Sequence, residues 1–196
     1  MPDETRSLPS PTKELPVLHS EEGMAHVHER MSLLVGKVAR ASAQLEFTLR
    51  QLMVSLVDSK YAETVAAGLG ANELVDMCTA LVKINREVTE AQREECRTRL
   101  GGIKPLLARR NQLVHGFWAP MHVAEGEPLP EGALALVSKR RTAMAVVEIS
   151  FEQAEQLADE LSRTQSETFS WICRSLLAQL RREQVTEPPE GTGMTR

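Results

Sequence analysis

The amino-acid sequence predicts a mainly α-helical protein, an up-and-down bundle of about four or five helices with a small β-hairpin or three-stranded insert before the last helix. Three observations support this prediction. Apolar residues recur with a period near 3.5 between residues 20 and 59, aromatic residues make up only 4% of the chain, and two Ser/Thr-x-x-Gln sequences match the capping box that begins many helices. So few aromatic residues also argue against an all-β sandwich and against a surface that stacks nucleic-acid bases.

The 196 residues suffice for one domain with a buried core between two polar ends. Residues 1–19 hold four prolines among Ser, Thr and charged residues, which predicts a disordered N-terminal arm. Residues 183–196 predict a flexible C-terminal tail, so the helical domain spans 20–182. The acidity is concentrated in residues 1–23, with a net charge of −3, and 183–196, with a net charge of −2, because residues 24–182 carry 20 basic and 19 acidic side chains.

The first predicted element is a long helix over about residues 20–59. One series of apolar residues has a spacing of seven, and a second series follows it four positions later, with Ser42 completing this second series. The two series are Met31, Val38, Leu45 and Leu52, and Val35, Leu49 and Leu56. This period is typical of helices that pack nearly antiparallel in a bundle. An unbroken helix of this size is about 50–60 Å long, and Gly36 is a candidate bend.

Two shorter helices are predicted next. Residues 61–72 contain two glycines and indicate a short helical turn leading into a loop. We expect Asn72 to cap a helix that extends from residue 73 to about 85. Thr89 and Gln92 form the first capping box and begin a third helix towards His115.

The third helix has two predicted irregularities. Pro105 lacks an amide hydrogen and clashes with the preceding turn, so we expect a kink or a break there. Gly116 is well placed to end the helix in a left-handed conformation.

The pattern becomes β-like over residues 117–150. The segments 117–123, 133–139 and 142–150 favour strands, and the basic residues Lys139, Arg140 and Arg141 form a turn between two of them. A charged turn of this kind could contact an RNA backbone, although such turns are usually only solvated. Ser150 and Gln153 form the second capping box, which begins a last helix to about residue 182.

Several classes of protein and site are excluded or disfavoured. The chain has no run of eighteen apolar residues and no apolar signal-peptide region, so we expect a cytoplasmic protein that does not bind membranes. The three cysteines, Cys78, Cys96 and Cys173, are widely spaced, which favours buried thiols over a disulfide framework. His26 and His28 are two residues apart and point in different directions on a helix, and no metal-binding or phosphate-loop motif occurs. We therefore expect no metal ion and no cofactor.

The candidate chemistry lies in the segment ARRNQLVHGFW, residues 108–118. RNA carries its own nucleophile, the 2′-hydroxyl, so its cleavage needs a base to accept that proton and a cation to stabilise the pentacovalent phosphate. Histidine suits the first role and arginine the second, and neither requires a metal. One geometric obstacle exists, because positions five apart on a regular helix lie about 140° apart around its axis. Arg110 and His115 can meet only if the arginine reaches round, the last turn distorts, or a second subunit completes the site.

The string Arg110-Asn111-Gln112-Leu113-Val114-His115, in a helical bundle, resembles the motif of the HEPN superfamily (higher eukaryotes and prokaryotes nucleotide-binding). Members of that family show an Arg, often followed by a polar residue, and a His four to six positions after the Arg. Many are dimeric, metal-independent ribonucleases of toxin–antitoxin or other defence systems. The resemblance implies that Arg110 holds phosphate, that His115 is the general base or acid, and that Asn111 orients the site.

The resemblance also implies partners and leaves alternatives. It implies a homodimer in which two motifs face each other, an RNA substrate, and an antitoxin or regulatory protein partner. Arg109 also satisfies the spacing, although Asn111 after Arg110 favours Arg110; Arg109 is then a substrate-binding candidate together with residues 139–141. Glu46 is a candidate accessory acidic residue, for which a salt bridge is the simpler role. The alternative function is a catalytically silent HEPN-like dimerisation or interaction module.

Overall fold

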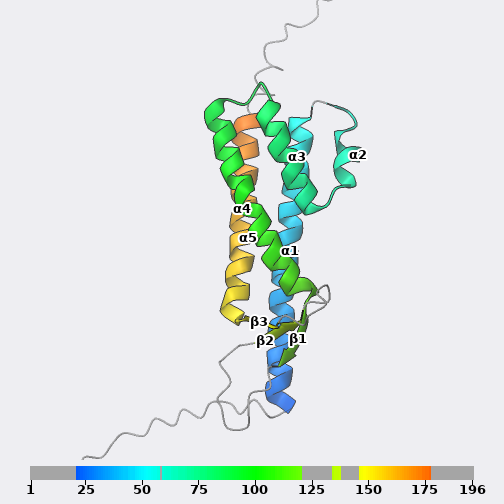
Figure 1. Cartoon of the computed structure of the whole chain (residues 1–196), viewed down its shortest axis with the longest axis vertical. Helices are drawn as coiled ribbons and strands as arrows, with labels where there is room; N and C mark the ends of the chain where they lie inside the picture. The colour runs from blue at the N-terminus through cyan, green and yellow to red at the C-terminus, as the bar shows by residue number, and fades with distance from the viewer. Residues whose placement is uncertain (1–20, 58, 121–133, 138–145, 178–196) are drawn as a thin grey trace, which may run out of the picture.

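The computed structural model describes residues 21–57, 59–120, 134–137 and 146–177. It is mainly helical, as the sequence predicts, with five α-helices (Figure 1). The predicted arm 1–19 and the predicted tail 183–196 both lie outside the described residues.

Helix α1, Glu21–Leu56, is the longest element and continues through Gly36. The predicted heptad series forms its buried face, because Val38, Leu45 and Leu52 are all completely buried. This face packs mainly against α5 and α3. The alternation of apolar and polar residues along α1 is therefore explained by one continuous contact with the rest of the bundle.

Helices α2, Ala62–Ala67, and α3, Ala71–Ile84, follow. The expectation that Asn72 caps α3 is wrong: Gly70 is the N-cap residue, and its backbone N–H donates to Glu73 Oε2 at 2.8 Å. Glycine has no side-chain oxygen, so it caps none of the unpaired N–H groups in the first turn of α3. This helix end is therefore free to contact other groups.

Helix α4, Glu90–His115, begins with the predicted capping box, in which Thr89 accepts from the Gln92 backbone N–H. The expected break at Pro105 does not occur, because the helix continues through it. Pro105 has no N–H to donate to the carbonyl of Gly101, four residues earlier. Both residues are exposed, so water can satisfy that carbonyl. The expectation of a left-handed Gly116 is also wrong. Its φ of −76° and ψ of 157° are extended and lead directly into the next strand.

Three short strands follow: β1, Phe117–Pro120; β2, Leu134–Val137; and β3, Val146–Ile149. They form an antiparallel sheet in the order β1-β2-β3, with Phe117 opposite Val137 and Leu134 opposite Ile149. Residues 121–133 and 138–145, which make up much of the predicted insert and include its basic turn, lie outside the described residues. The insert as a whole stays a prediction.

Helix α5, Phe151–Ile172, begins at the second predicted capping box and continues into a π-helical turn, Cys173–Leu177. Figure 1 shows that α1, α4 and α5 lie along one another, with α4 running opposite to the other two. The completely buried Trp171 and Leu161 of α5 belong to the single core that α1, α3 and α4 also form. In Figure 1 the beginning of α3 and the final turns of α4 both lie beside α1, and this arrangement creates the site described below.

Candidate functional site

The predicted motif lies at the C-terminal end of α4. Leu107 and Leu113 are buried in the core and fix which side of the helix faces inward. Asn111 and His115 are therefore exposed, and Arg110 is half-buried between solvent and the core. A helix held on one side by leucines presents these three polar side chains from a rigid support.

Arg110 joins the other two members of the motif. Its Nη1 donates to Asn111 Oδ1 at 2.8 Å and lies 3.4 Å from His115 Nε2. A guanidinium has no acceptor atom, so in the longer contact the imidazole Nε2 is the acceptor. Of the three routes across the 140° separation, the structure contains the first, in which the long arginine side chain reaches round the helix. The groups thus meet within one chain.

Arg109 lies elsewhere. Its Nη1 is 2.7 Å from Glu160 Oε2 on α5, an ion pair that joins the two helices. The structure does not bring Arg109 together with His115, whereas no ion pair within the described residues joins Arg110 to a carboxylate. The substrate-binding candidates Lys139, Arg140 and Arg141 lie outside the described residues.

A cavity of about 320 Å³ lies beside Arg110, between α1, α3 and α4. Its polar lining residues are Ser42 and Glu46 of α1, Asn72 and Glu73 of α3, and Arg110 and Asn111 of α4. Sequence reasoning suggested Glu46 for this neighbourhood but gave Ser42, Asn72 and Glu73 no functional role. These residues come from separate helices, so only the tertiary structure brings them to the motif.

Glu46 is paired as the simpler interpretation expects. Its Oε1 is 2.5 Å from Arg50 Nη2, one turn further along α1. The ion pair balances the charge of the carboxylate where it lines the cavity, and Glu46 remains a candidate accessory residue.

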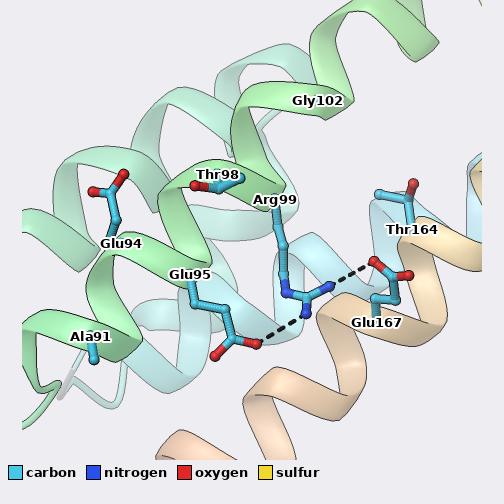
Figure 2. Close-up of a pocket in the computed structure, with 8 residues that line it drawn as sticks. All are labelled: Ala91, Glu94, Glu95, Thr98, Arg99, Gly102, Thr164 and Glu167. Carbon is cyan, nitrogen blue, oxygen red and sulfur yellow. Dashed lines mark hydrogen bonds and ion pairs between the residues drawn. The ribbon is translucent and has the colours of Figure 1, made fainter.

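A larger cavity, about 730 Å³, lies between α4 and α5 (Figure 2). Figure 2 shows Arg99 between two carboxylates, and the distances are 3.0 Å to Glu95 and 2.6 Å to Glu167. Glu95 also accepts from Arg174 at 3.0 Å. The Arg99 guanidinium is thus paired with carboxylates of the protein and joins α4 to α5, which is a structural role. Arg110 differs because its donors face an amide, an imidazole and a cavity.

Within residues 21–57, 59–120, 134–137 and 146–177, no three His, Cys, Asp or Glu side chains gather closely enough to hold a metal ion. None of the helices in those ranges combines the length and apolar character needed to cross a bilayer.

Comparison of the chain with protein-family models, with curated proteins and with solved structures gives no match.

Proposed function

We propose that this protein is a HEPN-like, metal-independent endoribonuclease that uses the 2′-hydroxyl of its RNA substrate, in the manner of a toxin or defence effector. The observation that supports this function is the contact between Arg110 and His115, 3.4 Å apart and close to Asn111. The motif residues that the family uses are thus side by side on an accessible helix end. Arg110 is free of carboxylate partners among the described residues, so its charge is available to a phosphate.

The proposed reaction follows from these groups. A ring nitrogen of His115 accepts the 2′-hydroxyl proton, and the 2′-oxygen attacks the adjacent phosphorus. The guanidinium of Arg110 donates to the equatorial oxygens, which gain charge in the transition state. The bond to the 5′-oxygen breaks and that oxygen takes up a proton, which leaves a cyclic phosphate on one fragment and a 5′-hydroxyl on the other. Asn111 Oδ1 holds the guanidinium in place through the 2.8 Å hydrogen bond.

RNA cutting in the presence of EDTA tests this function. We expect His115→Ala and Arg110→Ala to lower the cleavage rate about 100- to 10,000-fold, the usual contribution of a general base or a charge-stabilising group. Arg97→Ala is the matched control, because Arg97 is an exposed arginine of the same helix and, within the described part of the chain, pairs with Glu94 alone, at 3.2 Å. Arg109→Ala decides between the neighbouring arginines. If His115→Ala still cuts RNA, or if the wild type cuts no RNA, the proposed ribonuclease function is wrong.

One observation favours the alternative of a silent interaction module. Leu33 and Phe47 are each 62% exposed and lie on one side of α1, with Lys37, Arg40 and Gln44 between them on that side. Large exposed apolar side chains with polar neighbours are a feature of some partner surfaces. The module predicts a stable homodimer or a complex with a regulatory protein and motif variants without chemical effect. Size-exclusion chromatography with light scattering, run beside the cleavage assay, distinguishes the two.

A further inference from the structure

Among the residues that line the cavity beside Arg110, one side-chain atom is buried without a partner, the Nε of Arg110 itself. Ser42 is 2% exposed, lines the cavity, and makes no hydrogen bond to any residue of the described structure. Hydroxyls within helices commonly bond the carbonyl four residues earlier, as Thr48 does with Gln44 at 3.0 Å and Ser162 does with Ala158 at 2.9 Å. The Ser42 hydroxyl is open to the cavity, so a polar molecule there can supply its partner. Together with the unpaired Nε of Arg110, it indicates that this cavity suits a polar ligand.

The cavity is lined by both hydrogen-bond donors and hydrogen-bond acceptors. The uncapped first turn of α3, where Ala71 and Asn72 lie, presents backbone N–H groups, and the Asn111 amide nitrogen is a further donor because its oxygen accepts from Arg110. The acceptors are the carboxylates of Glu46 and Glu73. A ligand that hydrogen-bonds to both kinds of group must itself carry donors and acceptors.

The charges argue against a phosphate inside the cavity. Glu46 is balanced by Arg50 and Glu73 accepts from the Gly70 N–H, but both carboxylates keep a second oxygen that repels an anion. The small residues Gly70 and Ala71 and the apolar Leu107 complete the lining and leave room for a flat group. A cavity of about 320 Å³ also lies within the usual size range of small-ligand sites. A neutral, planar, hydrogen-bonding group fits these walls, and a nucleobase has this chemistry.

The carboxylates further select among the bases. Cytosine, adenine and guanine each carry an exocyclic amino group that donates to a carboxylate, whereas uracil presents carbonyl oxygens on both sides of its single N–H. We propose that the cavity between α1, α3 and α4 binds an amino-bearing nucleobase of the nucleotide whose phosphate Arg110 contacts. This assignment rests on the proposed ribonuclease function and predicts that the enzyme prefers cytosine, adenine or guanine to uracil at this position.

Nucleotide binding by the full chain carrying His115→Ala, which cannot cut by the proposed route, tests the assignment. Calorimetric titrations with CMP, AMP, GMP, UMP and inorganic phosphate should show at least one amino-bearing nucleotide binding about tenfold more tightly than UMP, the value of one good base contact. Ser42→Ala and Glu46→Gln should remove most of this difference. Glu94→Gln is the matched control, because Glu94 is an exposed glutamate that pairs with Arg97 outside this cavity. Thermal melts confirm that each variant is folded.

Equal binding of all four nucleotides, binding of inorganic phosphate as tight as that of the nucleotides, no binding at all, or a preference that Ser42→Ala and Glu46→Gln leave intact overturns the base site. Base-selective binding that both variants abolish supports it, whether or not the wild-type protein cuts RNA. Failure of the ribonuclease proposal appears separately, as absence of cutting by the wild type.

Discussion

Arg93 fastens the turn between α3 and α4, and its replacement by lysine tests how firmly these helices are joined. Its Nε donates to the carbonyl of Val82 at 3.1 Å, and its Nη2 donates to the carbonyls of Asn85 at 3.0 Å and Val88 at 3.2 Å. Val82 lies in the last turn of α3, where carbonyls have no helical partner. One planar guanidinium thus satisfies three acceptors along the connecting chain.

Lysine keeps the charge but replaces the guanidinium fork with a single ammonium, which can serve one of these carbonyls in the same place. A hydrogen bond to a charged donor contributes about 1.5–3 kcal/mol. The Arg93 side chain is 21% exposed, so water recovers part of the loss. For two lost bonds we expect Arg93→Lys to lower the free energy of unfolding by about 2 kcal/mol, or up to about 30-fold in the equilibrium constant.

Urea unfolding followed by far-ultraviolet circular dichroism measures this loss. Arg97→Lys is the matched control, because that side chain is 53% exposed and, among the described residues, its ion pair is with Glu94, at 3.2 Å. Exposed pairs of this kind contribute less than about 1 kcal/mol. If Arg93→Lys and Arg97→Lys shift the urea midpoint equally, the three carbonyl contacts do not hold the turn and the reasoning fails.

Two further predictions concern α4 and the thiols. Gly101→Ala should raise the free energy of unfolding by about 0.5–1 kcal/mol, because alanine favours a helix interior and, beyond the adjacent backbone of α4, no described heavy atom lies within 4 Å of the added Cβ. A lower urea midpoint contradicts this. Burial raises the pKa of the thiols of Cys78 and Cys96 from 9.0 to about 12, so iodoacetamide should label only Cys173 in the native protein, as mass spectrometry can check. Because the unfolded chain loses those protons first, the urea midpoint should also fall as pH rises above about 9, and a flat profile refutes the burial.

The sequence predicts the elements whose signals are local. The seven-residue spacing through Val38 and Leu45 identifies the buried face of α1, because residues on one side of a helix meet the same neighbours. The capping box at Ser150 likewise depends only on residues within one turn. Pro105 could not be predicted in this way, because a proline ends a helix or not according to whether the lost carbonyl contact faces water.

The candidate site shows the same division. Spacing and residue type suggest Arg110 and His115, but only the side-chain conformation shows that the arginine crosses the 140° between them. In the sequence, Ser42 is only one more position of the buried face of α1. That its hydroxyl lines a cavity is visible only in the tertiary structure, because α3 and α4 supply the other lining residues.

The neighbouring arginines Arg109 and Arg110 make α4 sensitive to chain length. Successive helix positions point about 100° apart, so Arg109 is directed to Glu160 of α5 while Arg110 is directed to His115 and the cavity. The buried Leu107 and Leu113 fix the rotational phase of the final turns, and the ion pair with Glu160 is compatible with that phase only. Substitutions between Gly102 and Arg109 leave this phase unchanged, but a change of length by one residue there turns the final segment by about 100°. An insertion then places Arg109 at the cavity, and a deletion places Asn111 there. For evolution or engineering, this stretch tolerates changes of side chain far better than changes of length.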